Sequence, residues 1–300
     1  KEIANRDDID LVLHLGDYIY EFGMGVFGDE DAQALNRVVV PRYELNSLKD
    51  YRQRYAQHKG DPDSQAMLAR HPLISIWDDH EISNDAWRLG AVNHSTDGSE
   101  GTFENRKKNA IKAYFEWMPI REPASDNSFI HRSFQIGDLV DLHMLDTRLI
   151  GRDQQLSYSN YTGLKTKQKP VHILNKTPKQ FDSKQFHQDL LEPNRSILGA
   201  NQEMWLERRL KTTNATWTVL GQQVMLAPQR WSVTKNLTEQ ESSVDSQELN
   251  MAMQKQTIKP ELTKNLDAWD GYPVARSRLY DMVAEHKKKL ITLSGDTHFS

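Results

Sequence analysis

Three short clusters in this sequence combine carboxylates with phenol or imidazole groups, which are common metal ligands. In the first, HLGDYIYEF, Asp17 follows a glycine that permits a sharp turn, and Tyr20 lies three residues further on. A carboxylate with a phenolate is a pair of hard oxygen ligands, which suits Fe(III), Ca²⁺ or Mn²⁺ better than a soft metal. The structural alternative is that Asp17 caps a turn and Tyr20 packs in the core.

The second cluster, IWDDHEISND, places two adjacent aspartates directly before His80 and Glu81. Carboxylates this close repel one another, so a cation should compensate their charge. Asp79 can therefore be a metal ligand, and His80 can bind metal or transfer a proton near neutral pH. The alternative is a charged loop with a capping aspartate.

The third cluster, LSGDTHFS, offers Asp296 and His298 two residues apart. On an extended segment both side chains point to the same side and can reach one binuclear centre. The alternative is a surface turn. Three such pairs, each after an apolar segment, are harder to explain by turns than any single pair, so the sequence predicts one shared metal centre.

Two further polar residues are candidates for the same site. Arg148, in LDTR, can place its guanidinium against a phosphate oxygen or form a buried salt bridge. Gln222, in GQQ, can form hydrogen bonds across the site or cap a turn. By contrast, His14 and His143 lie inside apolar segments, which predicts core residues rather than ligands.

Short apolar segments rich in β-forming residues precede these clusters and must position them. The predicted strands are residues 9–15, 72–77, 139–145, 217–220 and 290–293. A hairpin turn is predicted at Gly137 and Asp138. Helices are predicted at residues 48–56, 64–69, 106–118, 201–210 and 277–289. In α/β folds, ligand sites form at the carboxyl ends of the strands, so this order predicts an α/β fold with one site there.

Two polar stretches, residues 152–193 and 230–266, lack periodicity and are predicted to be insertions that serve as lids, binding loops or mobile segments. No Pro/Gly-rich linker divides the chain, so one domain over residues 1–300 is expected.

Composition excludes several classes of protein. The 300 residues carry a net charge of -4, no cysteine and a mean hydropathy of -0.73. A disulfide framework, a zinc ribbon and a cysteine nucleophile are excluded within these residues. No apolar run approaches the ~18 residues of a membrane span, and no signal-peptide pattern opens the chain. The charge balance does not favour a stable nucleic-acid partner.

The succession of motifs GD-YIYE, WDDHE, F-x-WMP, LDTR, GQQ, WDGYP and SGDTHFS resembles the alkaline-phosphatase-D-like branch of the calcineurin-type metallophosphoesterases, over nearly the whole chain. The resemblance implies a four-layer α/β/β/α sandwich with a binuclear metal site at the strand ends. It implies Fe(III) with Ca²⁺ as the metals, with Mn²⁺ or Mg²⁺ as alternatives. It also implies export to the periplasm or the extracellular space.

The resemblance assigns roles by motif position. Asp17 would bridge the metals, Tyr20 would bind Fe(III) as a tyrosinate, and Asp79 falls where the wider superfamily has an asparagine ligand. Asp296 and His298 fall on the last ligand pair. His80 would assist the leaving group, and Arg148 and Gln222 would contact the substrate.

The resemblance further implies a chain that is incomplete at both ends. The family's first metal-binding strand, with an acidic and a cysteine ligand, would lie upstream of Lys1, and an N-terminal β-sandwich would precede it. The second sheet would continue after Ser300.

The function so implied is hydrolysis of phosphate mono- or diesters by a hydroxide held at the two metals. Its substrate would be a small-molecule, lipid or nucleotide phosphate ester. Two alternatives remain open at this point. One is another metal hydrolase, such as an amidohydrolase-like barrel, which needs about eight βα units and no hairpin. The other is a calcium-stabilised, non-catalytic binding module in which His80 has no role.

Overall fold

The computed structural model of the protein describes residues 1–26, 29–121, 130–161, 181–229 and 263–296. These residues form two compact units. The sheet unit comprises Lys1–Gln154, Ile197–Val224 and Met282–Ser300, and the second unit comprises Gln155–Ser196 and Met225–Asp281. All strands of the described part of the chain lie in the sheet unit.

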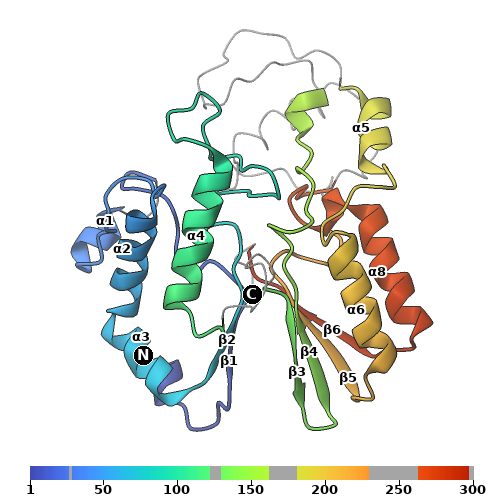
Figure 1. The fold of residues 1–300 in the computed structure, drawn as a ribbon, viewed down its shortest axis with the longest axis horizontal. Coiled ribbons are helices and arrows are strands. Elements are labelled where there is room, and N and C mark those ends of the chain that lie inside the picture. The colour runs from blue at the N-terminus through green and yellow to red at the C-terminus, as the bar shows by residue number, and fades with distance from the viewer. Residues whose placement is uncertain (27–28, 122–129, 162–180, 230–262, 297–300) are drawn as a thin grey trace, which may run out of the picture. The chain divides into compact units, whose positions relative to one another are not determined.

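The sheet unit contains two sheets (Figure 1). In the smaller one, β1 (Val12–His14) pairs in parallel with β2 (Leu73–Ser75). The larger sheet has the order β3-β4-β5-β6 and comprises Arg132–Ile136, Val140–Met144, Trp217–Gly221 and Leu290–Leu293. The β3–β4 pair is the antiparallel hairpin, whereas the β4–β5 and β5–β6 pairs are parallel. Each predicted strand is therefore confirmed.

The helices connect these strands, and the five predicted helices are confirmed. The helices are α1 (Asp29–Ala34), α2 (Leu48–Lys59), α3 (Pro62–Arg70), α4 (Phe103–Trp117), α5 (Ser183–Leu190), α6 (Ala200–Thr212) and α8 (Pro273–Glu285). Helix α2 begins at a capping box, in which the side chains of Ser47 and Asp50 each accept a backbone N–H of the other residue. The α1 and α5 helices were not predicted, because both are short and polar.

Helices cover the outer faces of the two sheets (Figure 1). The α2 and α4 helices lie on the side of β1 and β2, where the Trp77 and Tyr114 rings meet at 5.3 Å. Helix α6 lies on the four-stranded sheet, where Trp205 packs edge-on against His143 at 5.9 Å. This is the predicted α/β sandwich. Two open sheets replace the closed barrel of the amidohydrolase alternative within the described residues.

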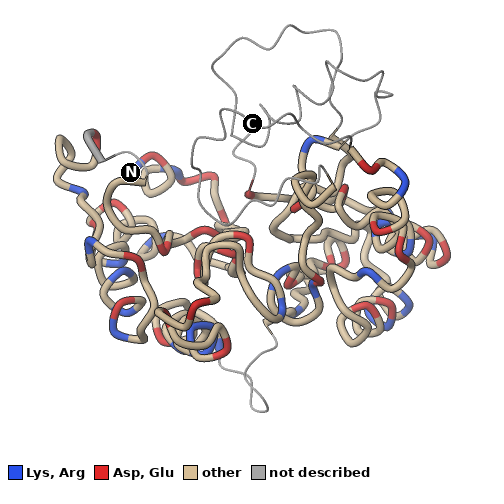
Figure 2. The backbone as a smooth tube through the Cα atoms, turned by 90° about the horizontal axis from the view of Figure 1, so that it is seen from above, with Lys and Arg blue, Asp and Glu red and all other residues tan. Residues whose placement is uncertain are grey.

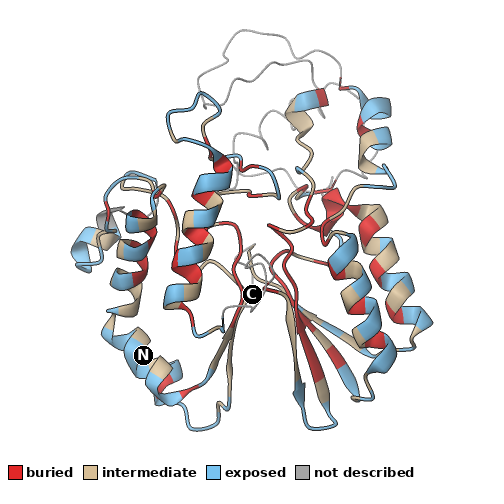
Figure 3. Cartoon of the chain, viewed as in Figure 1, coloured by how far each residue is buried: buried red, intermediate tan, exposed pale blue. Residues whose placement is uncertain are grey.

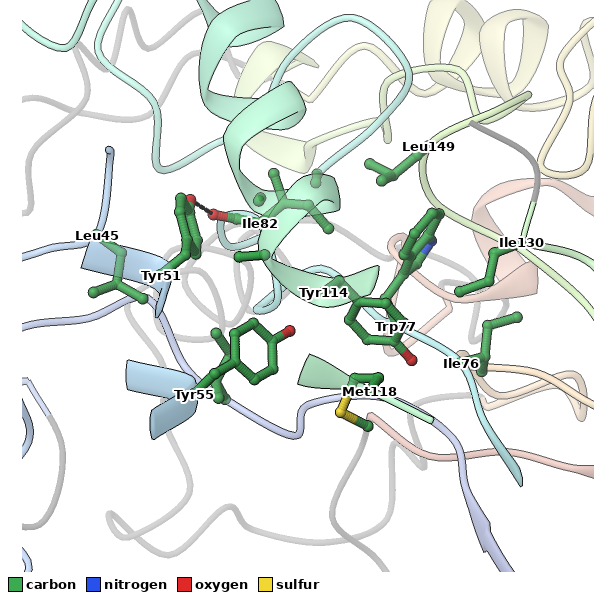
Figure 4. Packing of buried hydrophobic residues seen from close by; sticks show 14 of the residues in the cluster. Leu45, Tyr51, Tyr55, Ile76, Trp77, Ile82, Tyr114, Met118, Ile130 and Leu149 are labelled. Atoms are coloured by element: carbon green, nitrogen blue, oxygen red, sulfur yellow. Dashed lines mark hydrogen bonds between the residues drawn. The ribbon is translucent and has the colours of Figure 1, made fainter. Parts of the chain in front are cut away.

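A hydrophobic core fills the sheet unit and holds the loop that follows β2 (Figures 3 and 4). Trp77, the last residue before the two aspartates, is fully buried. The Tyr51 hydroxyl donates a hydrogen bond to the backbone oxygen of Ile82 at 2.5 Å, which is drawn in Figure 4. These contacts fix the WDDHE segment at both of its ends.

Charged residues of both signs are interspersed along the outer helices (Figure 2). On α4, Lys108 pairs with Glu104 and Lys112 pairs with Glu116, both at the i,i+4 spacing. No helix in the described parts of the chain combines the length and the apolar character needed to cross a membrane.

The second unit has its own small aromatic core of Tyr158, Tyr161, Phe181 and Phe186. Within this unit Trp269 and Tyr272 are buried, so WDGYP contributes to packing. Much of the two predicted insertions, residues 162–180 and 230–262, lies outside the described residues.

Gly16 occupies a position that no other residue fits. Its φ angle is 118°, and a Cβ atom there would lie 2.3 Å from Asp78 Cβ and 2.7 Å from Asp78 N. The loops after β1 and β2 therefore touch at this point. We expect Gly16→Ala to lower the free energy of unfolding by about 2–4 kcal/mol, because backbone strain and a collision add together. Urea unfolding monitored by circular dichroism measures this difference.

Gly98→Ala is the matched control for this substitution. Gly98 also has a positive φ, of 85°, but nothing lies within 4 Å of the added Cβ. We expect Gly98→Ala to lower the free energy of unfolding by only about 1 kcal/mol, from backbone strain alone. Equal losses in the two variants would contradict the close approach of the loops.

Candidate metal centre

Side chains from three strand ends converge in the sheet unit. Ligand atoms of Asp17, Asp79 and His80 lie within 4.8 Å of one another, and so do those of Asp78, Asp79 and Asp296. Asp17 follows β1, the Asp78–His80 segment follows β2, and Asp296 follows β6. The structure thus brings together residues of all three clusters singled out from the sequence. His298 lies outside the described residues, so its place as a ligand stays a prediction.

Three aspartates around the cluster have left-handed backbones. The φ angle is 60° at Asp17, 64° at Asp296 and 53° at Asp85. This conformation is uncommon for residues other than glycine, although aspartate tolerates it better than most. The Asp85 N–H donates to Asp79 Oδ2 at 2.5 Å and so orients that carboxylate. Sequence reasoning missed Asp85, because its role depends on backbone geometry rather than on its side chain.

The carboxylates of the cluster fit a metal ion. Asp17 Oδ1 and Asp79 Oδ1 are buried and accept no hydrogen bond from the described residues, although Arg148 Nη2 lies 3.4 Å from the latter. A buried carboxylate oxygen without a donor is costly, and a hard cation is the partner that such an oxygen favours. Burial, together with the charges of Asp79 and Glu81, raises the pKa of Asp17 to about 8. A bound cation would offset this repulsion.

Arg148 supplies part of the compensating charge. It is fully buried; its Nε donates to Asp78 Oδ1 at 2.5 Å, and its Nη2 donates to Asp296 Oδ1 at 3.2 Å. Burial would raise the pKa of Asp79, but the charges of Arg148 and His80 lower it below its usual range. The buried salt bridge is therefore observed at Arg148, and its contact with a phosphate oxygen stays a prediction.

Tyr20 lies beside Asp17, as a hard-oxygen pair requires. Its hydroxyl donates to Asp17 Oδ2 at 3.3 Å, and its ring stacks on His80 with centroids 4.1 Å apart. Burial and the neighbouring Asp17 raise the pKa of Tyr20 above its usual range. Tyr20 thus has its oxygen at the carboxylates and its ring against the imidazole.

His80 is oriented by Glu21, a residue that sequence reasoning missed. Its Nδ1 lies 2.7 Å from Glu21 Oε2, and Glu21 is fully buried. Burial would lower the pKa of His80, but the hydrogen bond to Glu21 and the charge of Asp79 raise it to about 10. Both ring nitrogens therefore carry a proton at neutral pH, and Nε2 is the one left to face a ligand. The sequence signal for Glu21 is faint: one acidic residue between Tyr20 and Phe22.

Two glutamines join the strand ends behind the cluster. The Gln222 Nε2 donates to Val224 O at 2.6 Å and to Ser294 Oγ at 2.7 Å. The Gln223 Nε2 donates to Trp77 O and Leu145 O, both at 2.8 Å. Gln222 thus caps the turn that follows β5, which is the structural role considered for it above. Its contact with substrate stays a prediction.

Comparisons with known proteins agree with this arrangement. A family model described as PhoD-like phosphatase matches residues 1–300. Alkaline phosphatase D of Bacillus subtilis (strain 168) is 30% identical over an alignment 300 residues long, which covers 98% of this chain and 42% of that protein. A solved structure described as "Structure of PhoD" is 29% identical, with a TM-score of 0.72 over 99% of this chain and 47% of that one.

The chain spans less than half the length of either relative. The family match nevertheless covers every residue of it, and the fold of the solved structure agrees with the two-sheet α/β arrangement. The resemblance drawn from the motifs is thereby confirmed. This chain belongs to the PhoD-like phosphatase family.

Proposed function

We propose that this chain carries the catalytic site of a metal-dependent phosphoric ester hydrolase. The observation that carries the proposal is the convergence of Asp17, Asp79 and His80 within 4.8 Å, at the ends of two parallel strands. Membership of the PhoD-like phosphatase family supports the reaction class. We also propose that residues 1–300 belong to one catalytic domain, which is part of a longer protein.

Asp17, Tyr20, Asp79 and Asp296 would hold the metal ions, with His298 added by resemblance. Bound metal ions supply Lewis acidity that neutralises phosphate oxygens and lowers the pKa of water. The four described residues all offer hard oxygen atoms, which supports Fe(III) with Ca²⁺ and also suits Mn²⁺ or Mg²⁺.

His80 would move a proton to the leaving group. Because Glu21 takes Nδ1, the ring presents Nε2–H, and the raised pKa keeps that proton in place until the ester oxygen develops charge. Stacking on Tyr20 fixes the plane of the ring. Arg148 would limit the repulsion among the carboxylates, and it would also hold a phosphate oxygen if its guanidinium becomes accessible.

The substrate class is a small-molecule, lipid or nucleotide phosphate mono- or diester, with no stable nucleic-acid partner. Export to the periplasm or extracellular space is part of the same proposal, on the strength of the family resemblance. The test is turnover of p-nitrophenyl phosphate and bis(p-nitrophenyl) phosphate by the full-length protein. Release of p-nitrophenol from either ester supports the proposal, and release from neither contradicts it.

Glu21→Gln is expected to lower kcat about 10- to 100-fold with little change in KM, because glutamine holds the imidazolium more weakly than a carboxylate does. The measurement is steady-state hydrolysis of p-nitrophenyl phosphate. The matched control is Glu116→Gln, which breaks the exposed ion pair between Glu116 on α4 and Arg52 on α2 and should leave kcat unchanged. Equal kcat values in the two variants would show that Glu21 has no role in catalysis.

A further inference from the structure

Glu81 joins the two loops that carry the carboxylates of the cluster. Its side chain is buried, with 1% of the residue exposed. Oε2 accepts hydrogen bonds from Asp17 N at 3.0 Å and Asp78 N at 2.8 Å, and Oε1 accepts one from Tyr18 N at 2.5 Å. One carboxylate therefore receives three backbone N–H groups, two from the loop after β1 and one from the loop after β2.

These bonds begin where the backbone ladder ends. The β1–β2 register stops at His14 and Ser75, and one further backbone bond runs from Ile76 N to His14 O at 3.0 Å. Beyond it the loops still touch, since a Cβ on Gly16 would collide with Asp78. At this contact the hydrogen bonds to the Glu81 carboxylate join the two loops, in place of backbone bonds between the strands.

Repulsion between the ligand carboxylates opposes this contact between the loops. The Asp17 side chain is half-buried and that of Asp79 is buried, and their ligand atoms lie within 4.8 Å of one another, so the two carboxylates repel whenever both are ionised. Both oxygens of Glu81 already accept N–H groups, and Glu81 belongs to neither of the two ligand groups found among the described residues. Its geometry is that of a brace and not of a ligand.

We propose that Glu81 is a positioning residue that fixes the spacing of Asp17 and the Asp78–Asp79 pair before metal binds. This inference rests on the proposed function, in which these residues hold the metal ions. Groups that orient metal ligands typically contribute about 10- to 100-fold to metal affinity. Glu81 would make this contribution through the backbone N–H groups of the ligand loops.

The test is Ca²⁺ binding by the metal-depleted full-length protein, measured by calorimetry for the unsubstituted protein and for Glu81→Gln. Glutamine keeps the shape of the side chain, but its NH₂ group cannot accept from the N–H group that it faces. We expect the dissociation constant for Ca²⁺ to rise about 10- to 100-fold.

The matched control is Asp50→Asn. It makes the same acid-to-amide change in a carboxylate that also accepts backbone N–H groups, those of Asn46 and Ser47. The control should change the dissociation constant less than about twofold.

A rise no larger than that of the control would overturn the proposal. If Glu81→Gln does not fold, hydrogen exchange of the unsubstituted, metal-free protein decides the question. The amides of Asp17, Tyr18 and Asp78 should then exchange at least about 10-fold more slowly than in an unstructured peptide. Unprotected amides would overturn the brace.

Failure of the brace and failure of the proposed function give different results. An unsubstituted protein that binds no Ca²⁺ and hydrolyses no ester would contradict the proposed function. The exchange rates of the three amides would still test whether Glu81 holds the two loops together. A protein that binds metal and turns over substrate, but shows unprotected amides and an unchanged Glu81→Gln affinity, would contradict only the brace.

Discussion

Asp17→Asn is expected to reduce both metal content and ester hydrolysis by at least about 100-fold, more than removal of a group that merely orients a ligand. Asparagine keeps the size of the side chain and tolerates the left-handed backbone at this position, where φ is 60°. The substitution therefore removes the charge of a buried oxygen that accepts no hydrogen bond from the described part of the chain, with little added strain. Elemental analysis of the purified full-length protein and kcat/KM on p-nitrophenyl phosphate measure the two losses.

Asp138→Asn is the matched control. Asp138 is exposed at the turn of the β3–β4 hairpin, and its backbone oxygen, not its side chain, accepts a hydrogen bond from Thr216 N. The Asp138→Asn protein should have the same metal content and activity as the unsubstituted protein. An Asp17→Asn protein that retains full metal content would show that Asp17 is not a ligand.

His80→Ala is expected to lower kcat about 10²- to 10⁴-fold, the usual contribution of a positioned acid or base. Metal content should stay unchanged, because the oxygen ligands remain. The loss follows from removing the Nε2 proton that Glu21 and Asp79 hold on the ring. Single-turnover hydrolysis, with elemental analysis of the same sample, separates the chemical step from metal loss.

This variant also separates the enzyme from a calcium-stabilised binding module. A module with structural carboxylates would keep its ligand affinity when His80 is replaced, whereas the phosphatase should lose turnover while it retains metal. His286→Ala is the control, since this half-buried imidazole follows α8 and lies outside the two ligand groups. If the two variants have the same kcat, His80 is not the proton donor.

The sequence was sufficient for the elements that position the site. Residues 72–77 and 290–293 were predicted as strands because β-branched and apolar residues end abruptly in acidic clusters, and the structure has β2 at Leu73–Ser75 and β6 at Leu290–Leu293. Asp17, Asp79 and Asp296 were predicted to share one site because each follows an apolar strand, and sites in α/β folds form at the carboxyl ends of the strands. Their proximity in the structure agrees with that reasoning.

The supporting residues could not be predicted, for physical reasons. Glu21 and Glu81 are charged residues in buried positions. Glu21 meets His80, and Glu81 meets the N–H groups of Asp17 and Tyr18, across more than fifty residues of chain. Asp85 acts through a backbone N–H in a left-handed conformation, which the tertiary structure imposes. Sequence patterns report periodicity and residue type, but they do not report which distant backbone group a buried carboxylate will meet.

Metal removal tests the central claim most directly. The full-length protein would be dialysed against a strong chelator, assayed on p-nitrophenyl phosphate and its bis ester, and assayed again after Fe(III) with Ca²⁺, or Mn²⁺, is restored. We expect hydrolysis to fall at least about 100-fold on removal and to return on addition of metal, because Asp17 and Asp79 would hold the ions that supply the Lewis acidity. Undiminished hydrolysis by protein shown to be free of metal would contradict the account.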